Sequence, residues 1–173
     1  MSRRLALPLR WAKEIGRPAS IPLGRPRGAK LEGIRYERKL ATALASPVCG
    51  QWFDYTDASG RYGFCQTDAI VRVGETLVVL EAKYTWTEDG HRELEGLYLP
   101  VVEEAGWAKP IGLVISRNLV PSRGQLGVRS TLSEAIEAAE GGRVVWHWLG
   151  VGPLLLRPPK GHEVRPCMAV PAI

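Results

Sequence analysis

The sequence predicts one α/β domain in which a mixed β-sheet is flanked by helices. Helical and strand periodicities alternate along the chain in the order helix, three strands, helix, strand, helix, strand, a mixture typical of a sheet covered by helices. The 173 residues suffice for one compact domain and are too few for two well-packed ones. No apolar run reaches the roughly 18 residues that a membrane-spanning helix requires, so no membrane span is predicted.

The first predicted helix occupies the segment GAKLEGIRYERKLATALASP and ends before Pro47. Its apolar residues recur at helical spacing, at Ile34, Ala41 and Leu44. Glu37 falls within that apolar stripe, which is an unusual position for a charged side chain. The segment QWFDY, residues 51–55, predicts the first strand.

A β-hairpin is predicted next, with strands at 64–73 and 76–84 after a polar turn. Gly74-Glu75 suits a two-residue loop, because glycine is preferred at the first position of a type II′ turn. In that register Asp68 faces Glu81, and Gln66 faces Lys83. Alternation then places one set of side chains on a single side of the hairpin: Gln66, Asp68, Ile70, Leu77, Val79, Glu81 and Lys83.

The remaining elements have weaker signals. Residues 89–105 carry apolar residues on one helical face, including Tyr98, but Gly96 and Pro100 should kink or split this helix. The continuous apolar run 110–116 is typical of a strand covered on both faces. A later helix is predicted to begin at a capping box formed by Thr131 and Glu134 and to end at Gly141, after Glu140. Residues 144–149 predict a last strand, with Trp146 and Trp148 in the core and His147 exposed.

Charge divides the chain into a basic Pro/Arg-rich arm (1–29), a folded domain (30–150) and a Pro-containing tail (151–173). Residues 1–30 hold eight Lys or Arg residues and one Glu, a balance of 8 − 1 = +7, which leaves 5 − 7 = −2 for the rest. The arm is either a solvated tail or a segment that follows the phosphates of DNA. In the second case Arg25, Arg27 and Lys30 are candidate contacts.

The cysteine pattern favours neither a zinc site nor a disulfide framework. Cys49, Cys65 and Cys167 are odd in number and contain no CxxC pair. The N-terminus also lacks the apolar run and small-residue cleavage site of a signal peptide. A cytoplasmic location is therefore expected.

The hairpin acids require an explanation, because two carboxylates about 5 Å apart repel by roughly 3 kcal/mol at an effective dielectric of about 20. A divalent cation between them would offset the repulsion, and Mg²⁺ binds one or two carboxylates together with water and phosphate oxygens. The alternative is a solvent-facing strand end at which Lys83 simply pairs with an acid.

These residues, in this order, resemble the PD-(D/E)XK nuclease superfamily. The resemblance covers residues 30–116 and rests on GIRYERKLATAL, QTDAIV and VVLEAK. It implies a restriction-endonuclease-like core of the order αβββαβ. It also implies that Asp68, Glu81 and the Ala82 carbonyl bind Mg²⁺ or Mn²⁺, that Lys83 orients or helps to deprotonate the attacking water, and that Glu37 binds a second ion or a metal-bound water.

The implied function is a Mg²⁺-dependent deoxyribonuclease acting in phage DNA processing, repair or recombination, for example on Holliday junctions. His91, on the link after Lys83, is a candidate phosphate contact or a solvated loop histidine. One alternative is a non-catalytic protein of the same fold that binds DNA or assembles into a phage particle or homo-oligomer. Another is a small-molecule or metal-binding domain without nucleic acid.

Overall fold

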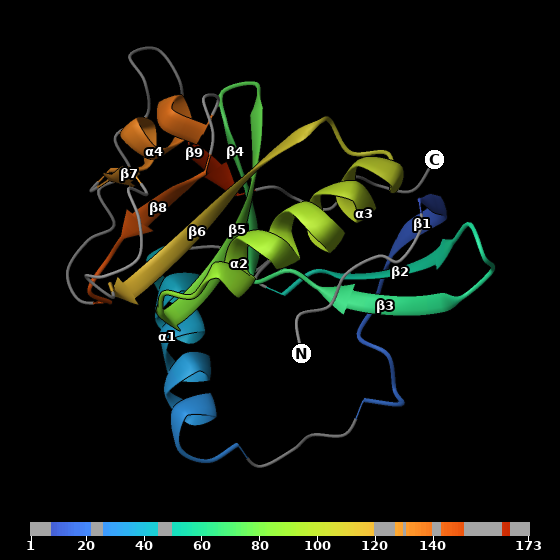
Figure 1. Ribbon diagram of the computed structural model, residues 1–173, viewed down its shortest axis with the longest axis horizontal. Helices are drawn as coiled ribbons and strands as arrows, with labels where there is room; N and C mark the ends of the chain where they lie inside the picture. The colour runs from blue at the N-terminus through green and yellow to red at the C-terminus, as the bar shows by residue number, and fades with distance from the viewer. Residues whose placement is uncertain are drawn as a thin grey trace.

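The computed structural model describes residues 8–21, 26–44, 50–119, 127–129, 131–139, 143–150 and 164–166. These residues form two sheets with helices against them (Figure 1). The predicted α/β class, with a mixed sheet flanked by helices, is confirmed. Within the described ranges, no helix is long and apolar enough to cross a membrane.

The larger sheet has six strands and mixes parallel and antiparallel pairs. Strands β5, β6, β8 and β7 run parallel to one another, whereas β4 is antiparallel to both β5 and β9. In sheet order the strands are β7 (Gly127–Arg129), β8 (Val144–His147), β6 (Pro110–Asn118), β5 (Thr76–Thr85), β4 (Ala69–Val73) and β9 (Val164–Pro166).

The smaller sheet has three antiparallel strands in sequence order. These are β1 (Leu9–Ile15), β2 (Trp52–Asp57) and β3 (Tyr62–Gln66). Its inner face joins the core through Ala12, Phe53 and Cys65. Figure 1 shows this sheet beside α3 (Leu99–Glu104), which contacts β1.

Alternating side chains of β5 divide the core between the two faces of the larger sheet. Val78 and Leu80 pack with helices α1 (Ala29–Ala43) and α4 (Leu132–Ala139). Leu77 and Val79 pack with the helical segment formed by α2 (Glu88–Glu93), a π-helical turn η1 (Leu94–Tyr98) and α3. Strand β6 is covered on both faces as predicted, because Leu113 and Val114 belong to opposite sides.

The predicted hairpin register is confirmed from Ala69 opposite Leu80 to Val73 opposite Thr76, with Gly74 at φ 59° in the loop. The predicted continuous strand 64–73 is wrong, because β3 ends at Gln66 and β4 begins at Ala69. The chain passes there from one sheet to the other, and Gln66 pairs with Trp52 instead of Lys83. A hydrogen bond from Gly50 N to Asp68 O, 3.1 Å long, closes this crossing.

Part of the predicted basic arm is a strand of the fold. Residues 9–15 form β1, and Ala12 is buried in the core between β2 and α3. The boundary expected at residue 29 therefore cuts through a folded unit. Of the predicted tail, only Val164–Pro166 is described, and it pairs with β4. Pro47, Glu140 and Gly141 lie outside the described residues, so those predicted helix ends stay predictions.

The predicted interruption of the helix at 89–105 takes the form of the π-helical turn. Pro100 has no N–H for the Gly96 carbonyl, and its ring would collide with that carbonyl in a regular helix. The wider turn at Leu94–Tyr98 absorbs both effects directly before α3. The capping box is also confirmed, since Glu134 N donates to Thr131 Oγ1 and Thr131 N donates to Glu134 Oε2, both at 3.3 Å.

Candidate functional site

An acidic cluster around one lysine lies where β4, β5, α1 and α2 meet. Asp68 immediately precedes β4, Glu81 and Lys83 lie on β5, Glu37 lies on α1, and Glu93 ends α2. Glu81 and Lys83 share a face with Leu77 and Val79, because side chains two residues apart on a strand point the same way. That face is the one covered by α2, as the contacts below show.

Asp68 is tied to the backbone of β5. Its Oδ2 accepts a hydrogen bond of 2.6 Å from Ala82 N, directly beyond the last paired residues of the hairpin. The Asp68 carboxyl also lies within hydrogen-bonding reach of the Glu81 carboxyl. Asp68 and Glu81 therefore lie side by side, although Asp68 is not part of a regular strand pair.

Lys83 bridges two acids from different elements. Its Nζ lies 2.5 Å from Glu81 Oε1 and 2.8 Å from Glu93 Oε2. Glu93 was missed at the level of the sequence. It stands four residues before Leu97, at the edge of the apolar stripe of its helix, so the criterion that singled out Glu37 would also have found it.

Glycine at position 90 allows α2 to approach the lysine closely. A Cβ atom at Gly90 would lie 3.3 Å from Lys83 Cε and 3.2 Å from Val114 Cγ2. Any larger residue would therefore press on the Lys83 side chain. Gly90 thus helps to position the ammonium group between its two acids.

The pKa shifts follow from burial and from the crowding of like charges. Burial, and then the charge of Glu37, raise the pKa of Asp68 to about 7. Burial and the charge of Asp68 raise the pKa of Glu81 well above its ordinary value. Burial also raises the pKa of Glu37, although Lys83 opposes the shift. The carboxyls of the cluster therefore keep protons at pH values at which isolated carboxyls in water would have lost them.

The pKa of Lys83 is also raised, but for a lysine this favours the charged form. Burial alone would lower the pKa of its ammonium group, but the ion pairs with Glu81 and Glu93 outweigh burial and raise it above its ordinary value. Lys83 thus stays charged at neutral pH. Lys83, together with Arg38 near Glu37, supplies two positive charges against four carboxylates, so full ionisation of the cluster calls for an additional cation.

The donor set suits a hard divalent cation bound mainly by Asp68 and Glu81. Two ionised carboxylates can only accept hydrogen bonds, so the contact between them is a hydrogen bond only while one acid is protonated. With both ionised, the buried Glu81 Oε2 has no hydrogen-bond partner within the described part of the chain. Mg²⁺ needs only one or two carboxylates when phosphate oxygens and water complete its shell, and Mn²⁺ prefers similar oxygen ligands.

Glu37 does not extend this pair into a complete protein cage. Among the described residues, no three His, Cys, Asp or Glu side chains are grouped so that they could hold a metal ion. Glu37 is linked to Asp68 and Lys83 through charge. Ala82, the other predicted metal ligand, is buried in β5, and its N–H is bound to Asp68.

Tyr98 approaches the cluster from the π-helical turn. It is buried, and burial together with the charges of Glu81, Glu93 and Asp68 raises the pKa of its phenol. From the sequence Tyr98 is expected either to pack in the core or to approach the acids, and in the structure it does both. The wider turn, which places Tyr98 near the acids, depends on Pro100 two residues later.

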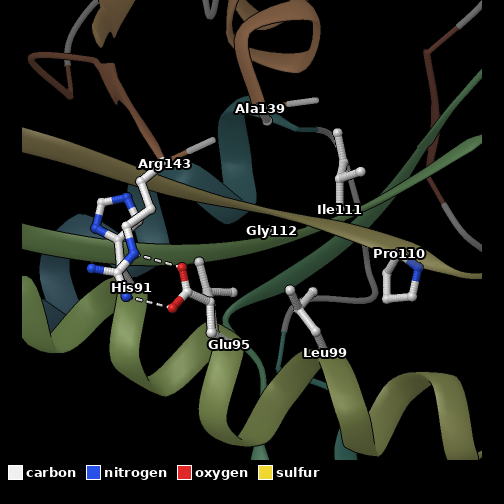
Figure 2. A pocket seen from close by; sticks show the side chains of 9 residues that line it. His91, Glu95, Leu99, Pro110, Ile111, Gly112, Ala139 and Arg143 are labelled. Carbon is white, nitrogen blue, oxygen red and sulfur yellow. Dashed lines mark hydrogen bonds and ion pairs between the residues drawn. The ribbon is translucent and has the colours of Figure 1, made fainter. Parts of the chain in front are cut away.

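The predicted loop position of His91 is wrong. His91 lies in α2, is only 4% exposed, and its Nε2 is 3.0 Å from the Val144 carbonyl oxygen. It lines a cavity of about 290 Å³ together with Arg143, which forms an ion pair with Glu95 (Figure 2). Arg143 also forms an ion pair with Glu88. Because the helix begins at Glu88, His91 is turned into the fold, where its side chain is too buried to contact a phosphate at the surface.

The other predicted residues have mixed outcomes. Trp146 and Trp148 are buried as expected, whereas His147 is half-buried, with its Nε2 2.9 Å from the Arg117 carbonyl oxygen. Arg25 lies outside the described residues. Arg27 and Lys30 line a cavity at the end of the three-stranded sheet.

Comparisons with family models, with curated proteins and with solved structures find no match to this chain. What can be stated of its class comes from the fold and the cluster. The chain is a mixed α/β protein with a buried cluster of acids around one lysine.

Proposed function

We propose that this protein is a Mg²⁺-dependent nuclease, able to use Mn²⁺, that hydrolyses phosphodiester bonds of DNA. The observation that carries the proposal is the placement of the Asp68 carboxyl, bound to Ala82 N, beside the Glu81 carboxyl, bound to Lys83 Nζ. The other oxygen of Glu81, Oε2, is buried and has no hydrogen-bond partner among the residues that the structure describes. The order of these residues along the chain resembles that of PD-(D/E)XK nucleases.

Each residue has a role that follows from its surroundings. Asp68 and Glu81 would hold the cation, which in such sites neutralises phosphate oxygens and lowers the pKa of bound water. Lys83 has a raised pKa, so it acts as a fixed positive donor that orients a water or a phosphate oxygen, in preference to a base. Glu37, at the edge of the cluster, would accept a hydrogen bond from water near Asp68.

One observation favours a second candidate, a protein of this fold that binds DNA or assembles with partners without cutting. Lys83 is held by two acids at once, Glu81 and Glu93, and so already neutralises part of the cluster. An ammonium group held by two ion pairs would stabilise the fold even if the protein catalyses no reaction. The two candidates differ in whether a cation and DNA cleavage depend on Glu81.

The deciding experiment is DNA cleavage by the full chain with increasing Mg²⁺. Glu81→Gln keeps the shape of the side chain and removes its charge. Cleavage should fall on the order of 100-fold or more, because a bound metal ion stabilises the charge of the transition state by several kcal/mol. Glu75→Gln, in the exposed hairpin loop, is the matched control and should cleave normally. Metal-independent cleavage, or full activity of Glu81→Gln, would refute the proposal; a folded wild-type protein without cleavage on duplex, single-stranded and branched DNA would favour the second candidate.

A further inference from the structure

A second cavity lies where residues 17–21 and 26–34 meet the end of the three-stranded sheet. Its volume is about 450 Å³. Three cations line it, namely Arg17, Arg27 and Lys30, and the ring of Trp52 and the side chain of Ile34 contribute apolar surface. None of the described residues in its wall is acidic.

The charges of this cavity are not compensated by neighbouring side chains. In the described part of the chain, Arg17, Arg27 and Lys30 take part in no ion pair. Arg17 donates one long hydrogen bond of 3.4 Å to the Ile21 carbonyl. Three positive side chains gathered at one cavity attract an anion, and phosphate is an anion that both Arg and Lys bind.

The aromatic wall adds a second requirement. Trp52 is half-buried, and its ring lies 6.2 Å from that of Phe64 on the same sheet face. A tryptophan held in this way offers a rigid surface on which a flat ring can stack. A phosphate beside a flat ring is the chemistry of a nucleotide.

Two residues that line the cavity, one on α1 and one on the sheet, lie close in sequence to members of the acidic cluster. On α1, Ile34 precedes Glu37 by three residues, which is a rise of about 4.5 Å. On the sheet side, Gln66 precedes Asp68 by two residues, or about 7 Å of extended chain. Whatever occupies the cavity is therefore a short distance from Asp68.

We propose that this cavity binds one unpaired nucleotide of a nucleic-acid strand, with the base against Trp52 and the phosphate among Arg17, Arg27 and Lys30. A base inside a duplex is stacked on both faces and cannot lie on a protein ring, so the strand is single at this point. The cavity would lead the adjoining phosphodiester toward Asp68 and Glu81; this last step rests on the proposed nuclease function. The substrate class is then DNA with a single-stranded segment.

Binding is measured with the full chain in EDTA, so that the result does not depend on cleavage. The probes are a labelled oligothymidine of about 12 nucleotides, a duplex of the same length and an oligouridine, with thymidine monophosphate as competitor. The single strand should bind more tightly than the duplex. Trp52→Leu should weaken single-strand binding by about 5- to 150-fold, while Trp52→Phe, which keeps a ring, should retain most of it.

The charge contribution is read from the salt dependence. Arg27→Ala and Lys30→Ala should each reduce the slope of log K against log salt by about 0.7, the value for one phosphate contact on a single strand. Lys109→Ala, which removes an exposed cation just before β6, is the matched control and should leave the slope unchanged. Circular dichroism and the thermal midpoint establish that each variant is folded.

Each contrary result overturns a defined part of the proposal. Duplex binding as tight as single-strand binding, or no effect of Trp52→Leu, rules out the unpaired base. Thymidine monophosphate that competes as well as the strand makes this a site for free nucleotides, and tighter binding of oligouridine makes RNA the ligand. Single-strand binding without Mg²⁺-dependent cleavage would support this nucleotide site and contradict the nuclease proposal. Cleavage that does not depend on Trp52 would support the nuclease proposal and contradict this site.

Discussion

Lys83 Nζ lies 2.8 Å from Glu93 Oε2 and so joins strand β5 to helix α2 through a half-buried ion pair. Glu93→Gln keeps the shape but removes the charge. We expect a loss of about 1–3 kcal/mol in the free energy of unfolding, since hydrogen bonds between charged groups are worth more than neutral ones. Urea unfolding measures it, and Glu103→Gln, at an exposed position of α3, is the control.

The same variant also tests what Lys83 does. Removing Glu93 takes away one of the two ion pairs that raise the pKa of Lys83, so that pKa should fall. If Lys83 only orients water or phosphate while charged, cleavage at neutral pH should change by less than about tenfold, because the ammonium stays protonated. A new, strongly rising dependence of the rate on alkaline pH would identify Lys83 as a base instead.

The raised pKa of Asp68 predicts a pH dependence of stability in metal-free protein. The folded state holds this proton up to about pH 7, whereas an unfolded Asp loses it near 3.8. Between these values the folded state binds more protons, so the contribution of Asp68 to stability decreases as pH rises from about 4 to 7.

Asp68→Asn should remove this contribution, and the measurement is the thermal midpoint of both proteins in EDTA from pH 4 to 8. The wild type should lose more stability across the range than the variant. The two proteins must be compared because His91 also makes stability depend on pH. Its lowered pKa makes stability rise with pH, opposite to the effect of Asp68, and it does so equally in the wild type and in the variant. Identical profiles would show that Asp68 is already ionised in the folded protein.

Binding of a cation to the pair displaces these protons, so Mg²⁺ should raise the thermal midpoint more at pH 8 than at pH 5. The increase should disappear in Glu81→Gln and persist in Glu75→Gln. A midpoint that rises equally in all three proteins would indicate general salt stabilisation and no site at Glu81.

The close approach of Gly90 to Lys83 can be tested with a matched pair of glycines. Gly90→Ala places a methyl group 3.3 Å from Lys83 Cε, so the lysine must shift, and we expect cleavage to fall by about 10-fold. Gly33→Ala in α1 meets no atom within 4 Å, and should add up to about 1 kcal/mol of stability from helix propensity with cleavage unchanged. Equal activities of the two variants would show that Lys83 need not be held in place.

Local patterns were sufficient to predict the hairpin and its acids. The two-residue loop at Gly74 sets the pairing of β4 with β5, and strict alternation then places Glu81 and Lys83 on the face of Leu77. The break before Asp68 could not be predicted in this way, because it depends on a backbone contact with Gly50, far away in sequence. A prediction from local periodicity continues a strand for as long as the residues favour one, and it cannot see a contact with a distant segment.

The ion pair of Lys83 with Glu93 and the strand at 9–15 were missed for a related reason. A sequence shows that a helix carries a glutamate, but the rotation of the helix against the sheet decides which lysine it meets. In LRWAKEI the polar residues Lys13 and Glu14 are adjacent, which breaks the alternation expected of a strand with one buried face. Pairing with β2 overrides this weak local signal.

Strand β1 supplies the last prediction, which separates a folded strand from a solvated arm. Ala12 is 7% exposed and faces the core, whereas its neighbour Lys13 is exposed on the other face. Ala12→Asp would bury an unpaired charge, and we expect it to cost about 2–4 kcal/mol of the free energy of unfolding. Lys13→Gln should change that free energy by less than about 0.5 kcal/mol, as is usual for exposed positions. Urea unfolding of the two variants makes the comparison. If Ala12→Asp is as stable as Lys13→Gln, residues 9–15 do not form part of the folded core in solution, and the whole basic segment is free to contact DNA.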